Sequence, residues 1–332
     1  GFLDALDASK DSALEEQRRQ DLEDIATTTR SLSKKNPEKK QGAYGKVAQH
    51  EQRAFANAAE LWAGLRLKFF DPVTSNMTVD SEDVRFCDDM LGRVSRSFAA
   101  VIRQLPPGLC LDVCVFYLVL RALDTVEDDM TAFNKGRESE KEKILRAFVD
   151  VDLQNRSASR TGIGEGDERL LLEKFGSVVR VFQDEVPEGS QRAIEDITRK
   201  MGNGMADYVT AELAQGTETT EAYDLYCHAV AGLVGEGLTK IFVARGFETD
   251  QITQGGAMTW PFCPRGELGL ANSMGLFLQK TNIIRDYLED FVDGRAFWPK
   301  TVWRAYANTN DLGEFARPTA RYSPRETLQN AV

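Results

Sequence analysis

The chain has 332 residues, of which 42% are hydrophobic, so it can form one large domain or two small ones around a packed core. Its 41 basic and 52 acidic side chains give a formal net charge of −11, which argues against nucleic acid as a partner. Two histidines are too few for a metal site built from several histidines, and no apolar stretch of 18 residues predicts a membrane-spanning helix.

The order of segments along the chain predicts an all-α protein. Residues 1–52 are polar and charged and predict a flexible extension, and one domain is expected from 53 to 332, with a first helix near Ala54. Apolar residues then recur at helical spacing over 82–103, 109–134, 137–150, 167–184, 189–214, 220–246 and 268–292. Proline and glycine mark the breaks between these segments, and residues 249–267 predict a surface loop.

The five cysteines, at positions 87, 110, 114, 227 and 263, lack the spacing of zinc ligands. Four of them lie in apolar or aromatic surroundings, so we interpret them as reduced thiols of the core.

Two acidic clusters end two long apolar segments. The first contains Asp124, Glu127 and Asp128, and the second contains Asp286 and Asp290. Side chains three and four positions apart share a face of a helix, so each cluster extends a polar stripe along its segment. The stripes are Tyr117, Arg121, Asp124 and Asp128 on one segment, and Gln279, Asn282, Asp286 and either Glu289 or Asp290 on the other.

A charged stripe is most often the solvated face of an amphipathic helix. Here the opposite faces are also apolar, as in Phe116 and Leu120 or Phe277 and Ile283, which predicts helices buried on all sides. The stripes would then line a cavity, because a buried carboxylate is costly without a partner. Magnesium suits such oxygen ligands, and a diphosphate held there could leave an allylic carbon under electrostatic catalysis. The carbocation would need an apolar pocket, for which Phe98, Phe116, Tyr117 and Tyr226 are candidates.

Four segments resemble the signature segments of the squalene synthases, a family of head-to-head prenyl synthases. They are Ser95-Arg-Ser-Phe-Ala-Ala-Val-Ile102, the segment from Val115 to Met130 that contains Asp-Thr-Val-Glu-Asp-Asp, Tyr226-Cys-His-Ala-Val-Ala-Gly-Leu-Val-Gly235, and the segment from Asn272 to Asp290. The resemblance continues through Arg295-Ala-Phe-Trp-Pro299 and covers about residues 81 to 304. It implies a class I isoprenoid synthase bundle around a central cavity.

The resemblance also implies an activity. Squalene synthases join two molecules of farnesyl diphosphate into presqualene diphosphate, and then reduce it to squalene with NADPH and Mg²⁺. On matching positions, the metal ligands would be Asp124, Glu127, Asp128, Asp286 and Asp290. Tyr226 would be the catalytic tyrosine of the first half-reaction, although a tyrosine that only packs between helices is the alternative.

The remaining site residues follow from the same resemblance. Arg96, Arg121 and Arg285 would bind the phosphates of NADPH or of the substrate, unless they only pair with nearby carboxylates. Ser95, Ser97, Phe98, Tyr117, Gln279 and Asn282 would contact the substrate. His228 is expected to be a hydrogen-bonded structural residue.

The match fades after Trp303, so the chain is expected to lack the C-terminal portion of the family, with its NADPH-contacting segment and membrane anchor. Phytoene-type condensation without reduction, a first-half enzyme, or a non-catalytic protein that binds isoprenoid diphosphates therefore stay as alternatives. The resemblance implies the cytosolic face of the endoplasmic reticulum membrane, or the cytosol if the chain is complete, and a monomer is expected.

Overall fold

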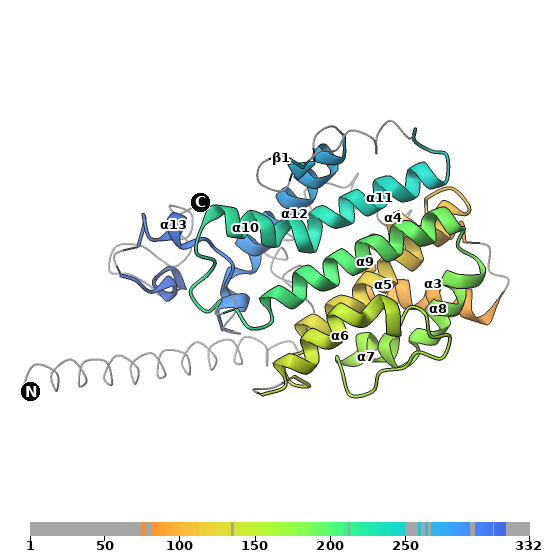
Figure 1. Cartoon of the computed structure of the whole chain (residues 1–332), viewed down its shortest axis with the longest axis horizontal. Coiled ribbons are helices and arrows are strands. Elements are labelled where there is room, and N and C mark those ends of the chain that lie inside the picture. Colours follow the sequence, from red (N-terminus) through yellow and green to blue (C-terminus); the bar gives the residue numbers. More distant parts are fainter. Residues whose placement is uncertain are drawn as a thin grey trace, which may run out of the picture. The chain divides into compact units, whose positions relative to one another are not determined.

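The computed structural model describes residues 75–77, 81–133, 136–211, 213–249, 258–259, 263–264, 267–292, 296–307 and 309–316 (Figure 1). The extension over residues 1–52 and the helix expected near Ala54 lie outside these residues. The chain divides into two compact units. The larger unit contains the described residues up to 211 together with 218–282, and the smaller unit contains 213–217 together with the residues from 283 onward. The prediction of one domain from 53 to 332 stays a prediction.

The larger unit is a bundle of helices, as the sequence predicts. Its elements are α3 (Glu82–Val94), α4 (Arg96–Ile102), α5 (Leu109–Asp128), α6 (Glu138–Val151), α7 (Gly166–Glu173), α8 (Phe175–Asp184), α9 (Glu188–Tyr208), α10 (Thr220–Cys227), the π-helical turn η4 (His228–Gly232), α11 (Leu233–Ala244) and the first part of α12 (Glu267–Val292). A short antiparallel pair, β1 (Met258–Thr259) and β2 (Cys263–Pro264), occupies part of the predicted loop 249–267.

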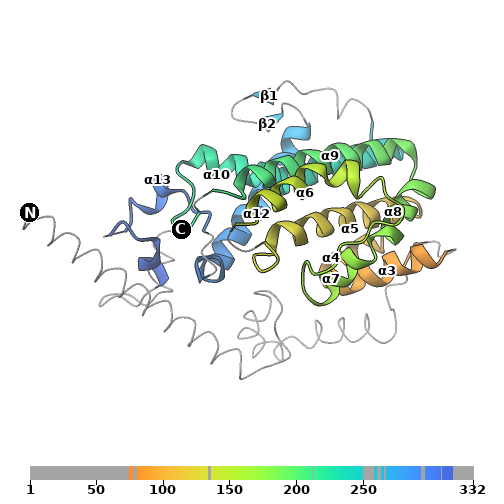
Figure 2. The same ribbon diagram turned by 60° about the horizontal axis from the view of Figure 1, so that its bottom comes forward.

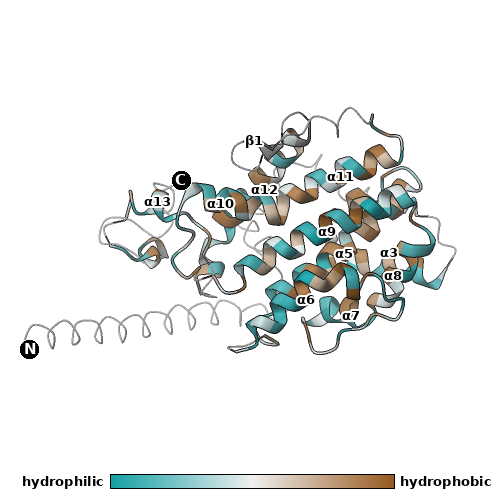
Figure 3. Ribbon diagram, in the orientation of Figure 1, coloured by the Kyte–Doolittle hydropathy of each residue, from teal (hydrophilic) through white to brown (hydrophobic). Residues whose placement is uncertain are grey.

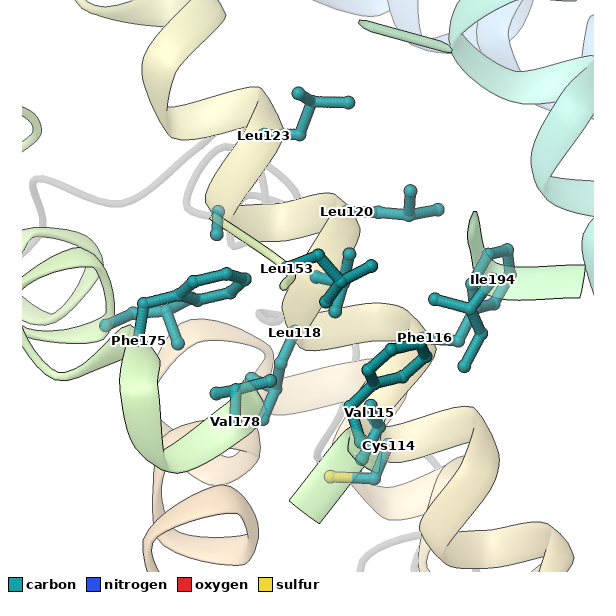
Figure 4. Packing of buried hydrophobic residues seen from close by; sticks show 14 of the residues in the cluster. Cys114, Val115, Phe116, Leu118, Leu120, Leu123, Leu153, Phe175, Val178 and Ile194 are labelled. Carbon is teal, nitrogen blue, oxygen red and sulfur yellow. The ribbon is translucent and has the colours of Figure 1, made fainter. Parts of the chain in front are cut away.

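Helix α5 is the centre of the larger unit. It packs against α3, α4, α6, α7, α8, α9 and α11. Its apolar residues point in all directions, because Leu118 lies near Phe175 and Val178 of α8 while Phe116 lies near Ile194 of α9 (Figure 4). Burial of the apolar faces of α5 is confirmed, whereas its polar stripe from Tyr117 to Asp128 is half-buried or exposed.

Helix α9 lies between α6 and α11 (Figures 1 and 2). Helices α6 and α9 each have a hydrophobic and a hydrophilic side (Figure 3), and on α9 the buried residues Ile194, Ile197 and Met201 follow helical spacing. The close packing of α6 on α9 depends on Gly202, where an added Cβ would overlap with the backbone oxygen of Leu145.

Several predicted helices are interrupted. The segment 82–103 divides at Ser95, whose backbone is extended (φ −147°, ψ 90°), and 167–184 divides at Lys174. The segment 109–134 ends at Asp128, because the Asp129 carboxylate accepts hydrogen bonds from the backbone N–H groups of Thr131 and Ala132 and folds a turn there.

The prediction that the chain contains no apolar stretch of membrane-spanning length is wrong, because one helical stretch is long enough and apolar enough. The continuous helical stretch Thr220–Ala244 meets both criteria. However, Glu236 and Lys240 of this stretch are paired with each other, and Lys240 also pairs with Asp196 of α9 at 2.8 Å. Such ion pairs with α9 indicate a helix of the bundle.

The smaller unit holds the C-terminal part of α12, together with α13 (Lys300–Trp303) and a 3₁₀ turn, η6 (Leu312–Ala316). Its core is aromatic: the Trp298 ring lies 5.4 Å from Tyr287 and 6.0 Å from Phe315. Residues 213–217 join this core through backbone hydrogen bonds from Ala296 to Leu213 and from Lys300 to Thr217.

Four of the cysteines, 87, 110, 114 and 227, are buried free thiols, which confirms that part of the prediction. Burial raises the pKa of Cys110 to about 11 and that of Cys227 to about 12, so both stay protonated and behave as apolar core groups.

An ion pair fixes the first turn of α5, and its removal should lower the stability of the protein strongly. The fully buried Asp112 accepts two hydrogen bonds from Arg245, at 2.6 and 2.5 Å. Asp112→Ala would leave the guanidinium without its partner, so we expect the free energy of unfolding to fall by about 3 kcal/mol in denaturant titrations.

Asp184→Ala is the matched control, because Asp184 also binds an arginine, Arg156, with two hydrogen bonds, but both side chains are about half exposed. Solvent screens this pair, so the control should change stability little. Equal losses in the two variants would contradict the special role of the buried pair.

Candidate active site

The polar stripe of α5 begins with two residues in direct contact. Tyr117 donates a hydrogen bond to the backbone oxygen of Val94 at 3.3 Å and accepts one from the Arg121 guanidinium at 3.2 Å. The guanidinium also lies over the tyrosine ring, 5.7 Å from its centroid. Nε of Arg121 is buried and has no hydrogen-bond partner among the described residues. Arg121 therefore keeps one donor that the surrounding protein does not use.

The next residue of the stripe, Asp124, is held in an environment that disfavours its charge. Burial raises the pKa of Asp124 to about 7; Arg121 counteracts this rise, while Asp128 and Glu168 add to it. Of the other acids at this end of α5, Glu127 is half-buried and Asp128 is exposed. The cluster thus concentrates negative charge that one arginine compensates only in part.

Glu168 is a member of this cluster that the sequence analysis missed. It lies at the start of α7, with a carboxylate oxygen 3.7 Å from Arg121. Burial raises the pKa of Glu168. The attraction of Arg121 lowers it, and the repulsion from Asp128 raises it. In the sequence it is one of two acids after Gly166 and reads as the ordinary acidic first turn of a helix.

The end of α5 is fixed by two further side chains. The buried Lys141 of α6 donates to the backbone oxygen of Glu127, in the last turn of α5. A cation there offsets the partial negative charge of the helix end, where the acids would otherwise be least stable. Asp129 accepts a hydrogen bond from the backbone N–H of Gly164 at 2.7 Å, so the carboxylate of this last acid of the motif fixes the loop before α7.

The junction of α3 and α4 lies beside the stripe. Ser95 is buried at this junction, and the Phe98 ring lies 6.0 Å from the Tyr117 ring while remaining 59% exposed. The side chains of Arg96 and Ser97 lie outside the described part of the structure. Phe116, a candidate for the carbocation pocket, is instead a core residue: it is 2% exposed and packs under Gly237 of α11.

Tyr226 is a buried residue of α10, near its C-terminal end. Its ring packs edge-on against Tyr208 of α9, with the centroids 5.1 Å apart and the planes at 75°. His228 follows in the π-helical turn and is hydrogen-bonded to Asn272 at 2.7 Å, which confirms that it is a structural histidine.

The second acidic cluster lies in the C-terminal part of α12. The Arg285 guanidinium binds the neighbouring Asp286 carboxylate with two hydrogen bonds, at 2.7 and 2.5 Å. Asp286 and Asp290 are both half-buried. The buried Tyr287 between them donates to the backbone oxygen of Leu312 at 2.7 Å and anchors this part of the helix in the smaller unit.

The expectation that α12 is buried on all sides is wrong. Phe277 is 62% exposed and Met274 is 61% exposed, although Ile283 is buried. Of the two predicted polar contacts on this helix, Gln279 is half-buried and Asn282 is exposed. The apolar residues of α12 therefore do not all contribute to the core of the described structure.

The two acidic clusters belong to different units, since Asp124 and Asp128 are in the larger one and Asp286 and Asp290 in the smaller one. The structure brings together Tyr117, Arg121 and Asp124 of the first stripe. The prediction that both clusters face one cavity stays a prediction.

Comparison with known proteins supplies the context of these residues. A family model for squalene/phytoene synthase matches residues 91–331. A squalene synthase of Eremothecium gossypii is 45% identical over 279 residues, which cover 82% of this chain and 58% of that protein. A lycopaoctaene synthase of Botryococcus braunii is 44% identical over 79% of this chain and 54% of that protein. The chain therefore spans little more than half the length of these relatives.

A solved structure agrees with the helical fold. The structure of TcSQS in complex with the ligand BPH1237 superposes with a TM-score of 0.65 at 42% sequence identity. The match covers 76% of this chain and 67% of that one. The all-α, isoprenoid synthase-type fold is thus confirmed.

The contact that closes the end of α5 can be tested directly. Lys141→Met would leave the Glu127 carbonyl without the ammonium donor, so we expect the free energy of unfolding to fall by about 1–2 kcal/mol in denaturant titrations. Lys143→Met removes the same charge from an exposed position of the same helix and should change stability little. If both variants lose the same stability, loss of charge rather than loss of the contact is responsible.

Proposed function

Because the chain belongs to the squalene/phytoene synthase family, we propose that its protein joins two molecules of farnesyl diphosphate head to head. Presqualene diphosphate would be the first product, and reduction with NADPH would convert it to squalene. The observation that carries the proposal is the stripe of Tyr117, Arg121 and Asp124 with Glu168, where half-buried carboxylates lie beside one arginine that has an unused donor.

The donor chemistry of the clusters fits Mg²⁺. Their groups are carboxylates, which are hard oxygen ligands. Burial raises the pKa of Asp124, and the neighbouring carboxylates of Asp128 and Glu168 raise it further, so a divalent cation would favour the charged form of Asp124. No three acidic, histidine or cysteine side chains of the described residues converge into a complete metal site. Magnesium usually takes one or two carboxylates and completes its shell with phosphate and water.

In the proposal, Asp124, Glu127 and Asp128 hold the metal ions at one diphosphate, and Asp286 and Asp290 hold those at the other. When bound, Mg²⁺ stabilises the negative charge that develops on the leaving diphosphate. Arg121 contributes a fixed positive charge beside the first cluster, and its free Nε–H can donate to a phosphate oxygen. Tyr117 keeps this guanidinium in place, so the donor is oriented before the substrate arrives.

The remaining residues have roles at the carbon centres and the cofactor. The Tyr226 phenol is buried beside another aromatic ring, where water is excluded and a proton can be exchanged with the isoprenoid. Phe98, Ser95 and Ser97 would contact one isoprenoid chain, and Gln279 and Asn282 the other. Arg96 and Arg285, together with Arg121, are the proposed partners of the NADPH phosphates.

A second candidate is supported by the relatives themselves. The lycopaoctaene synthase is as similar to this chain as the squalene synthases are, so identity alone does not select the product. The protein would then carry out the same condensation with a different isoprenoid diphosphate, or without the reduction.

Membership of the family also suggests the location, oligomeric state and partners of the protein. We propose that the protein acts as a monomer at the cytosolic face of the endoplasmic reticulum membrane, with two isoprenoid diphosphates as its partners. Its net charge of −11 supports the absence of nucleic acid among them.

The metal-binding carboxylates provide the main test. Asp124→Asn and Asp286→Asn should each lower the rate of diphosphate release from farnesyl diphosphate at least about a hundredfold, because one charge of a metal site is lost. Products are measured with Mg²⁺, with and without NADPH, and after chelation of the metal. Asp150→Asn removes an exposed carboxylate of α6 and is the matched control.

The products that form distinguish between the proposed functions. Squalene that forms only with NADPH supports the full proposal, whereas presqualene diphosphate in both conditions supports the condensation alone. Turnover that survives in both acidic variants contradicts the metal roles. An inactive parent chain that still binds farnesyl diphosphate supports a non-catalytic binding protein instead.

A further inference from the structure

The helix that carries Tyr226 contains a π-helical turn directly after it. Leu233 N–H donates to the backbone oxygen of His228, five positions earlier, so one extra residue is accommodated in the turn His228–Gly232. Turns of this kind cost stability and persist only where tertiary contacts hold them, often at functional sites. Helix α9 packs against this turn, and α12 supplies the side-chain contact at its ends.

Asn272 of α12 touches both ends of the turn. Its amide oxygen binds Nδ1 of His228 at 2.7 Å, and since an amide oxygen only accepts, the imidazole donates. At the other end, a Cβ on Gly232 would overlap with the same amide oxygen and lie 3.0 Å from Nδ1 of His228. Asn272 is 2% exposed, so its amide lies away from bulk solvent, and loss of a hydrogen bond there is costly.

The same part of α12 also holds the residues that precede Tyr226. The ammonium group of Lys280 lies 2.5 Å from the Asp224 carboxylate and 5.4 Å from the centroid of the Tyr223 ring. Close backbone packing joins the two segments between these contacts, because a Cβ on Gly275 would overlap with the backbone oxygen of Ala231. Helix α12 therefore contacts α10 just before Tyr226 and η4 just after it.

We propose that Asn272 is a positioning residue for Tyr226: it maintains the π-helical turn through His228 and Gly232 and so fixes the direction of the phenol. Lys280 supports the preceding turn through Asp224. The inference rests on the proposed role of Tyr226 in the condensation. It assigns a function to a buried amide that neither holds the substrate diphosphate nor belongs to the acidic clusters.

The test compares variants of Asn272 in the chain as it stands, with farnesyl diphosphate and Mg²⁺ as the assay. Asn272→Ala removes the acceptor, so we expect kcat for diphosphate release to fall about tenfold while KM stays within about threefold, because the binding groups are untouched. Asn272→Asp keeps an oxygen acceptor in the same place and should restore kcat to within about threefold of the parent.

The matched control is Ser273→Ala, on the next residue of α12. The Ser273 hydroxyl donates to the backbone oxygen of Gly269, within the same helix, and does not involve the turn. This variant should keep both kcat and KM. A drop in kcat that equals that of Asn272→Ala would mean that any lost side chain on α12 has the same effect, and it would overturn the inference.

A second readout separates this inference from the proposed function. The ring signals of Tyr226, in protein with ¹³C-labelled tyrosine, are assigned by their loss in Tyr226→Phe. We expect them to move in Asn272→Ala, because the edge-on contact with Tyr208 changes, and to stay in Ser273→Ala. Signals that do not move in Asn272→Ala overturn the inference even if activity is lost.

The double variant completes the design. If Asn272 acts through Tyr226, adding Asn272→Ala to Tyr226→Phe should lower kcat no further than Tyr226→Phe alone. Additive losses would show an independent effect and overturn the inference. If Tyr226→Phe keeps the full rate, the catalytic role of Tyr226 fails, whereas the ring signals still show whether Asn272 positions the side chain.

Discussion

The burial of charged groups on α5 is the constraint on which the larger unit depends. This helix is enclosed by seven other elements, yet it carries Asp112 at its start and Arg121 and Asp124 toward its end. Each such group needs a partner in its surroundings. Arg245 is the partner of Asp112, and Tyr117 and Glu168 are partners of Arg121. The neighbouring elements are thus placed by charge pairing as well as by apolar packing, and one acid, Asp124, lies in surroundings that raise its pKa.

The helical fold could be predicted because apolar residues recur at helical spacing in long segments. Apart from the turn at Asp129, the breaks could not, because they have no cause in the local sequence. Ser95 is compatible with a helix, and its extended backbone follows from the packing of α3 and α4 on α5. The π-helical turn is likewise invisible in the sequence, since Asn272, which touches both its ends, lies 44 positions after His228. Hydrophobic periodicity predicts helices, whereas tertiary contacts decide where they are interrupted.

The site was predictable where its residues share one helix. Tyr117 and Arg121 are four positions apart and touch, as their spacing predicts. Residues from other elements could not be found this way: Glu168 reads as an acidic first turn, and Lys141 as one of many charges on an amphipathic helix. The prediction for Phe116 is wrong for a related reason, because the same sequence pattern fits an apolar residue that faces the core and one that faces a cavity.

The segment 213–217 has a consequence for the order of folding. Thr217 pairs with Phe297, 80 positions later, and Leu213 with Ala296, so the smaller unit cannot close until α10, α11 and α12 have all been synthesised. Bringing together ends so far apart has an entropic cost that grows only slowly with loop length, but it slows the search for the native pairing. On the ribosome, the bundle around α5 can therefore form first, and the aromatic core around Trp298 forms after it.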